Sequence, residues 1–286
     1  MEPLNVEKRG YLKEDFRLFH LADNRLAPME YHYHSFHKIV ILLAGRASYA
    51  IEGAQYALAP GSFVLVSSGT IHRPETEAGV FYERMILYIS PDFLRRFRTE
   101  DCDLEQCFLR AQTDYRCVFR AGVADRIKPL LLALENAQQE TEFGARLMAQ
   151  SLFLQLMVEI NRLTLRSRSQ EAAAGDSRVV ELLHYLNLHI AETLSIDELA
   201  ARFYVSKYHM MRRFKEETGY TIHGYVTEKR LLLARQLLRD GIPVTKVGEQ
   251  CGYLDYSTFS RAYRKHFGHA PSQDSAESMI CTDNST

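Results

Sequence analysis

The feature that most constrains the fold is a short pattern that occurs twice in the C-terminal part of the chain. Residues 212–219 read RRFKEETG and residues 261–268 read RAYRKHFG. Both fit R-x-[FY]-[KR]-x-x-x-G, at an offset of 49 residues. A repeat at a fixed offset indicates that one supersecondary unit is used twice. We therefore predict two similar units in this region.

Each copy carries the signals of a short helix, a tight turn and a longer, capped helix. In the first copy, residues 195–198 (SIDE) fit a capping box for the short helix, Ser206 can cap the longer helix and Gly219 can end it. In the second copy, Asp255 and Gly268 take the capping and terminating positions. This order of elements predicts two helix-turn-helix units.

The two longer helices each present a polar, basic face opposite an apolar one. A recognition helix places its N-terminal residues at base edges in the major groove, where arginine can bond two acceptors of guanine. One basic face is common on a solvated helix, but two on repeated units favour DNA binding. Arg212 and Arg261 are the strongest candidates for base or phosphate contacts. The predicted DNA-binding residues are Ser206, Lys207, Tyr208, Met211, Arg212, Lys215, Tyr256, Ser257, Ser260, Arg261 and Arg264.

The second copy also fits a family signature. Residues 248–272 read GEQCGYLDYSTFSRAYRKHFGHAPS. This stretch resembles the pattern S-x-F-x-R-x-[FY]-[KR]-x-x-x-G-x-x-P-S of the AraC/XylS family of bacterial transcription regulators. The resemblance implies that one long helix, near residues 223–238, joins the two units and holds their recognition helices one DNA turn apart. The chain departs from the family at Asp274 and Ser275, where Tyr-Arg is usual, so the packing of the final helix is not predicted.

The first hundred residues show short runs rich in Val, Ile, Tyr and Phe, separated by turn residues. Residues 37–45 and 81–90 are typical of strands, and glycine turns separate further short runs between them. Regularly spaced short strands predict a sandwich or a small barrel. AraC-type regulators often carry an N-terminal cupin (jelly-roll) barrel that senses a ligand, and this region resembles that barrel.

Three histidines fit the two cupin motifs by their spacing. His32 and His34 form an H-x-H pair, and alternate side chains on a strand point to the same face. His72 falls at the histidine of the second motif, and the resemblance implies that all three face the barrel interior. Lys38 stands where a catalytic cupin has glutamate, and Ser67 stands where the second motif has proline.

The histidine cluster leaves two interpretations open. Three neutral imidazoles can bind zinc, nickel or copper, so a divalent metal held by His32, His34 and His72 is one of them. Lys38, however, removes an anionic ligand and adds a cation that can only donate. We favour a polar wall of an effector site that requires no cofactor, since small-ligand sites combine apolar linings with a few polar groups. Its predicted residues are His32, His34, Lys38, His72 and Tyr49.

Between these regions the apolar spacing becomes helical, which indicates helices that pack on the β-domain, form a dimer surface, or do both. We predict an α+β multidomain chain with an all-β cupin barrel and an all-α double helix-turn-helix domain. The predicted boundaries are 1–100 for the effector-binding domain, 101–168 for a helical connector or dimerisation segment, 169–177 for a linker, 178–273 for the DNA-binding domain and 274–286 for a disordered tail.

Composition excludes few classes of protein. The net charge is −1, and 46% of the residues are hydrophobic, which is ordinary for a folded chain. No apolar run is long enough to cross a membrane. Five cysteines without a C-x-x-C pair fit a reducing cytoplasm. Residues 177–274 hold 14 Lys and Arg against 11 Asp and Glu, which permits nucleic-acid binding without requiring it.

The sequence thus predicts a ligand-responsive transcription regulator of the bacterial cytoplasm, associated with the nucleoid, and not an enzyme. Its expected partners are a double-stranded DNA operator, a small-molecule effector (a sugar or another metabolite, by family analogy), a second copy of the chain and, if it activates, RNA polymerase. Two alternatives are a metal-dependent cupin enzyme with an accessory helical domain and a DNA-binding protein with a purely structural barrel. Bound iron or manganese would favour the enzyme, whereas absence of metal with salt-sensitive duplex binding would favour the regulator. A metabolite that raises the melting temperature would favour a sensor over a structural barrel.

Overall fold

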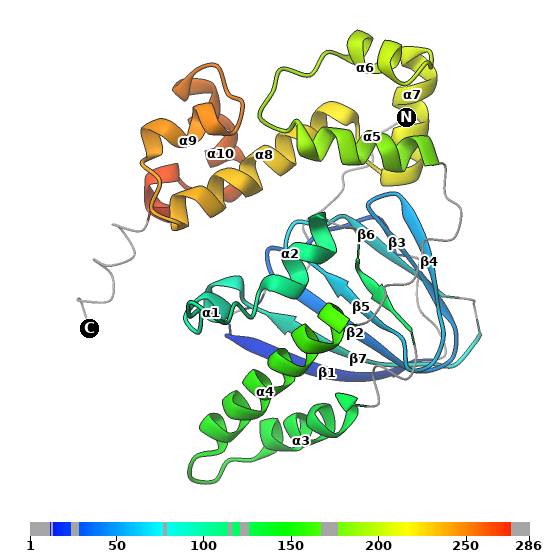
Figure 1. The fold of residues 1–286 in the computed structure, drawn as a ribbon, viewed down its shortest axis with the longest axis vertical. Coiled ribbons are helices and arrows are strands. Elements are labelled where there is room, and N and C mark those ends of the chain that lie inside the picture. The colour runs from blue at the N-terminus through cyan, green and yellow to red at the C-terminus, as the bar shows by residue number, and fades with distance from the viewer. Residues whose placement is uncertain are drawn as a thin grey trace. The chain divides into compact units, whose positions relative to one another are not determined.

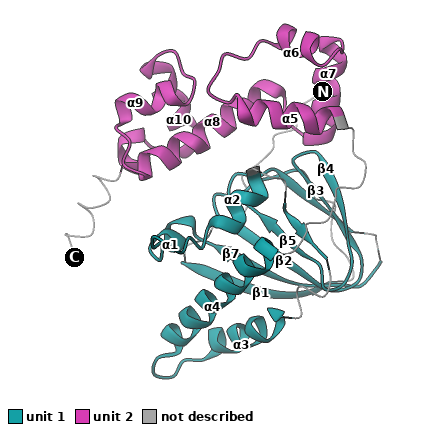
Figure 2. Cartoon of the chain, viewed as in Figure 1, with its two compact units in different colours: residues 1, 3–175 teal, residues 2, 176–286 magenta. Residues whose placement is uncertain are grey.

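The fold is taken from a computed structural model, which describes residues 12, 14–23, 29–76, 79–113, 116–120, 126–166 and 177–275. The chain divides into two compact units, residues 3–175 and residues 176–286 (Figure 2). The predicted linker, 169–177, lies outside the described residues apart from Ser177, which begins a helix. In the described ranges, no helix has the length and apolar character needed to cross a membrane.

The first unit is built on two antiparallel sheets (Figure 1). The larger sheet has the strand order β1 (Phe16–Asp23), β7 (Tyr82–Ile89), β2 (His37–Ala44), β5 (Phe63–Val66) and β8 (Val118–Phe119). The smaller has the order β4 (Ala54–Leu58), β3 (Ala47–Ile51) and β6 (His72–Thr76). Short strands in two facing sheets agree with the all-β architecture predicted for this region.

Strand β2 lies inside the larger sheet, where it pairs with β5 on one side and β7 on the other. Residues 37–42 of this strand are all buried, because both faces of the sheet are covered. A strand buried on both faces has a nearly continuous apolar sequence. The strand stops at Gly45, whose φ is +91°. A Cβ at this position would lie 2.0 Å from the carbonyl oxygen of Phe81, so only glycine fits there.

Four helices complete the first unit: α1 (Pro91–Arg95), α2 (Gln106–Thr113), α3 (Lys128–Gln139) and α4 (Ala145–Arg166). Phe153 of α4 stacks on Phe16 of β1 with ring centroids 4.2 Å apart. Asn161 of α4 accepts a hydrogen bond from the Cys107 amide at 2.9 Å and donates to the Leu104 carbonyl at 3.0 Å. These contacts place the connector helices on the β-domain. Helix α2 lies within the range 101–168 predicted for the helical connector.

The buried stripe of α4 does not extend to its N-terminal end. Leu147 is 68% exposed, whereas Phe153, Met157 and Ile160 are fully buried. The buried stripe begins later because only the part of α4 that follows Leu147 packs on β1 and α2. The exposed N-terminal end of α4 is therefore available for another contact.

The second unit is helical (Figure 1). Its elements are α5 (Ser177–Leu188), α6 (Ile196–Arg202), α7 (Lys207–Thr218), α8 (Ile222–Arg239), α9 (Val244–Gln250), α10 (Tyr256–Phe267) and the 3-10 helix η2 (Pro271–Asp274). The pairs α6–α7 and α9–α10 are the two predicted helix-turn-helix units, and α8 is the predicted joining helix. The α+β organisation is thus confirmed.

Helix α8 supplies the core of both units. Tyr225 meets Phe214 of α7 edge to face at 5.6 Å. Further along the same helix, Leu231 and Leu238 belong to the buried cluster that contains Phe259 of α10. Both helix-turn-helix units therefore bury apolar side chains against this shared helix, and that burial stabilises both.

Arg230 of α8 holds three backbone carbonyls. Its guanidinium donates to Ile190 at 2.8 Å, Glu192 at 2.6 Å and Gly252 at 2.9 Å. Gly252, with φ +79°, has no room for a side chain, since a Cβ there would lie 2.5 Å from the Ala191 carbonyl oxygen. Arg230 therefore ties the segment after α5 to the turn of the second helix-turn-helix.

Two details of the sequence-based prediction are wrong. Ser195 makes no side-chain capping bond, so the capping box at α6 is not formed. The predicted tail begins too early, because Asp274 is buried at the end of η2; residues 276–286 lie outside the described residues.

Asp274 is buried because basic and hydroxyl groups surround it. It accepts a hydrogen bond from the Tyr263 hydroxyl at 2.6 Å. Its carboxylate also lies 3.3 Å from Arg235 and 3.7 Å from Arg239, both on α8, and 3.5 Å from the ring of His269. The departure from the family pattern at this position is therefore accommodated by an ionic network that joins η2, α8 and α10.

Replacing Asp274 by alanine should lower the free energy of unfolding of the second unit by about 2–4 kcal/mol, since a buried hydroxyl and two partly buried guanidinium groups lose their acceptor. Urea titration followed by circular dichroism measures the change. Glu249→Gln removes an exposed carboxylate on α9. This control variant should unfold at the same urea concentration as the wild type. Equal stability of Asp274→Ala and wild type would show that the network does not stabilise the fold.

Candidate nucleic-acid interface and effector site

The two recognition helices begin at side-chain caps and end at glycines. The Ser206 hydroxyl accepts from the amide of His209 at 3.3 Å, which caps α7. The Asp255 carboxylate accepts from the amide and hydroxyl of Thr258 at 2.7 and 2.8 Å, which caps α10. Gly219 and Gly268 follow with φ of 76° and 83°. Both predicted caps and both predicted stops are therefore confirmed.

The outer face of α7 carries loosely held polar and apolar side chains. The Arg212 Nε lies 3.8 Å from Glu216, and the Lys207 ammonium lies 3.3 Å from Asp197. Exposed pairs of this kind contribute at most about 1 kcal/mol, so a stronger anion can displace them. Tyr208 is 76% exposed, and the opposite face buries Met210 and Phe214.

Helix α10 repeats this arrangement. Phe259 and Tyr263 are buried, whereas Arg261 is exposed and donates only a long bond, 3.4 Å, to the carbonyl of its own helix at Ser257. Of the predicted DNA-binding set, Lys215 and Ser260 are half-buried, and the other members are exposed: Ser206, Lys207, Tyr208, Met211, Arg212, Tyr256, Ser257, Arg261 and Arg264. Their contact with DNA stays a prediction.

Two large exposed residues precede the recognition helices and were missed by sequence reasoning. Tyr204 is 94% exposed in the turn before α7, and Leu254 is 96% exposed in the turn before α10. Each lies within a few residues of the end that a recognition helix presents to DNA. The signal that could have found them is the 49-residue repeat, which places Leu254 opposite Val205, beside Tyr204.

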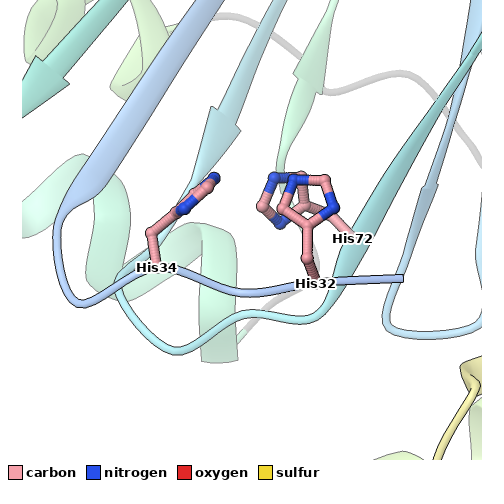
Figure 3. Close-up of side chains that lie close together, drawn as sticks. All are labelled: His32, His34 and His72. Atoms are coloured by element: carbon pink, nitrogen blue, oxygen red, sulfur yellow. The ribbon is translucent and has the colours of Figure 1, made fainter. Parts of the chain in front are cut away.

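In the first unit, His32, His34 and His72 come together (Figure 3). His32 and His72 exchange backbone hydrogen bonds of 3.1 and 3.0 Å. One ring nitrogen of each of the three histidines lies within 4.8 Å of the others. The side chains are 1%, 4% and 0% exposed in the same order. The predicted convergence of the two cupin motifs is therefore observed.

Backbone carbonyls orient two of these rings. The Nδ1 atom of His32 lies 2.8 Å from the Glu30 carbonyl, and that of His72 lies 3.0 Å from the Thr70 carbonyl. A carbonyl only accepts, so each Nδ1 carries the proton and each Nε2 keeps its lone pair. Burial, followed by the charge of Lys38 and the neighbouring histidines, holds the pKa of His72 well below its usual value. The ring is therefore neutral at pH 7.

Lys38 and Tyr49 lie beside the histidines. The Lys38 ammonium is 6.0 Å from the centroid of the Tyr49 ring, and that ring is parallel to His72 with centroids 6.5 Å apart. Burial, with a smaller effect of Arg84, lowers the pKa of Lys38 to about 8. Arg84 pairs with Asp23 at 2.6 Å. The structure thus brings together all five residues predicted for the effector site, and their role in binding stays a prediction.

The third histidine of the YHYHSFHK stretch does not join the cluster. His37 accepts from the Ser68 amide at 3.1 Å, and its other ring nitrogen lies 2.9 Å from Glu105. Its ring stacks on Phe108 of α2 at 4.1 Å. Because neighbours on a strand face opposite sides, His37 is directed to the helices while Lys38 is directed to the interior.

Comparison with known proteins accounts for both units. Residues 19–157 match the model of the AraC-like ligand binding domain, and residues 199–276 match a helix-turn-helix domain model. The HTH-type transcriptional activator RhaS of Citrobacter koseri is 30% identical over 244 residues, which cover 84% of this chain and 85% of the relative. RhaS of Klebsiella pneumoniae (strain 342) is 29% identical over 243 residues, with the same coverage of both chains.

Among solved structures, unsaturated fatty acid bound wild-type ToxT from Vibrio cholerae strain SCE256 is similar to this chain with a TM-score of 0.38 and 12% sequence identity. The alignment covers 92% of this chain and 96% of that one. Both relatives are transcriptional activators by name, and each aligns with this chain over 85% of its own length. The chain belongs to the AraC/XylS family, and it is a DNA-binding transcription regulator with an N-terminal effector-binding domain.

Proposed function

We propose that the regulator reads its operator with the N-terminal halves of α7 and α10. The observation that carries this proposal is the pair of capped helices, each with an exposed basic face and each in one copy of the repeated unit. Arg212 and Arg261 occupy equivalent places in the two copies. Each can donate two hydrogen bonds to guanine or bind a phosphate, and each is held only by weak contacts.

The effector is held by His32, His34, Lys38, Tyr49 and His72. These side chains support a binding role because they place several polar groups within an apolar interior, which is typical of ligand sites. An effector changes DNA binding only if it favours one arrangement of the regulator over another. The barrel then acts as a sensor and not as an enzyme, since Lys38 stands where a catalytic cupin needs a carboxylate.

The regulator acts as a homodimer in the cytoplasm. The surface that supports this proposal lies on the α3–α4 hairpin, where four large apolar side chains are exposed: Leu132, Phe143, Leu147 and Met148. Contiguous exposed apolar side chains mark interaction sites more often than chance. Because the relatives are activators by name, RNA polymerase is the further partner that we propose.

Replacing Arg212 or Arg261 by alanine should weaken binding to the operator by about 1–3 kcal/mol, or roughly 10- to 100-fold, because a bidentate contact is lost. Fluorescence anisotropy on an operator selected from genomic DNA measures the affinity. Arg162→Ala, which removes the same charge from an exposed position on α4, is the control and should bind as the wild type does. Unchanged affinity for both recognition-helix variants would exclude the assignment.

Changing Leu147 and Met148 together to glutamate should weaken self-association by at least about tenfold, since two carboxylates would be buried in an apolar interface. Sedimentation equilibrium gives the dissociation constant. Leu188→Glu alters a leucine with the same 68% exposure in the second unit and should leave the dimer intact. A wild-type chain that stays monomeric at high concentration, or a double variant that dimerises normally, would contradict the proposal.

A further inference from the structure

The three clustered histidines have a chemical property that a general polar wall does not need. In His32 and His72, the Nδ1 proton points to a backbone carbonyl, that of Glu30 and of Thr70 respectively. The Nε2 lone pair of each ring therefore points away from that carbonyl. The Nε2 atom of His72 is buried and has no hydrogen-bond partner within the described residues. Burying an acceptor without a partner costs about 1–3 kcal/mol. The Nε2 lone pair of His72 can therefore be satisfied by a group that accepts an electron pair.

The ring geometry favours one occupant that all three nitrogens share. The ring planes meet at 67°, 55° and 58° for the pairs His32–His34, His32–His72 and His34–His72. The three rings lie close together in Figure 3, and one nitrogen of each lies within 4.8 Å of the others, so a single ion can contact all three. A histidine that ligates a metal commonly donates its other N–H to a backbone carbonyl. His32 and His72 both make such a bond to a carbonyl. Three imidazoles suit zinc, nickel, cobalt or copper better than magnesium or calcium.

We infer that His32, His34 and His72 form a binding site for a divalent transition-metal ion, and that this ion is the ligand sensed by the effector domain. The inference rests on the proposed sensing function and names its ligand class. In the part of the chain that the structure describes, no carboxylate belongs to the cluster. The site thus consists of three neutral donors next to the ammonium of Lys38.

Lys38 lowers the affinity of the site for a metal ion, as expected for a sensor and not for a permanently bound cofactor. A carboxylate at this position would neutralise part of the ion's charge, whereas a buried cation repels the ion. Lys38 is 4% exposed and makes no ion pair within the described residues, so water and counter-ions screen its charge little. The affinity is therefore lower than that of a three-histidine, one-carboxylate site, and the ion exchanges with its surroundings, as a sensed ligand must.

The first experiment measures metal binding directly. Full-length protein is stripped with a chelator and titrated with Co²⁺, and uptake is followed by visible absorption and by metal analysis after gel filtration. We expect one ion per chain. His72→Ala and His34→Ala should each lower the affinity for Co²⁺ at least about 100-fold, because a residue that binds the ion directly contributes at least as much as the groups that orient it. His223→Ala, an exposed histidine of the second unit, should not change binding.

Lys38→Glu is the sharper test, because it predicts a gain that misfolding cannot produce. Glutamate restores the anionic ligand and should tighten Co²⁺ binding by at least about tenfold, and Lys38→Met, which only removes the cation, should fall between wild type and Lys38→Glu. Absence of stoichiometric uptake overturns the inference. Binding that is insensitive to His72→Ala, or no tighter in Lys38→Glu, also overturns it.

A second measurement separates this inference from the proposed function. DNA retention is compared with and without Zn²⁺ for the wild type and for His72→Ala, and Arg212→Ala serves as the DNA-binding control. We expect Zn²⁺ to change operator affinity in the wild type only. If the chain binds the operator but takes up no metal, the inferred metal site is wrong and the proposed function is retained. If the chain takes up metal but binds no operator, the proposed function is wrong and the metal site is retained. If it takes up metal and Zn²⁺ does not alter operator affinity, the ion is not the sensed ligand.

Discussion

Both DNA-reading units depend on the burial of α8 between them. Each unit has only one short and one long helix, and the apolar stripes of the long helices find their partner surface on α8, through Tyr225 on one side and Leu231 and Leu238 on the other. Arg230 of the same helix donates hydrogen bonds to the carbonyls of Ile190, Glu192 and Gly252, which lie on both sides of α8 in the chain. One helix therefore positions both long helices, and recognition of a DNA duplex by two helices depends on their spacing.

In the first unit, the corresponding constraint is the alternation of side chains along β2. His37 and Lys38 are neighbours in sequence, yet one pairs with Glu105 on the side of the helices and the other lies near Tyr49 in the interior. A shift of one residue in strand register would exchange these two environments. The pairing of β2 with β5 and β7 therefore fixes which charge faces the histidine cluster.

The two candidate sites use opposite electrostatic conditions. Arg212 of α7 and Arg261 of α10 are exposed, so their charges are screened and their local partners are weak, which suits competition for a polyanion. In the barrel, Lys38 and the histidines are buried, and desolvation keeps His72 neutral. Neutral imidazoles are electron-pair donors, whereas protonated ones are not. The arginines proposed to contact DNA are thus charged and exposed, whereas the histidines proposed to bind the effector are buried, and His72 is neutral.

The sequence by itself determined the features that are local in the chain. The caps at Ser206 and Asp255, the stops at Gly219 and Gly268 and the spacing within each of the two cupin motifs depend on residues close together in the chain, so their patterns were visible without a fold. Only the tertiary structure decided the burial of Asp274, the exposure of Leu254 and Leu147 and the contacts of Arg230. The acceptors of Arg230 lie 22 to 40 residues away. Packing between such distant segments sets burial and charge pairing, and no local pattern records it.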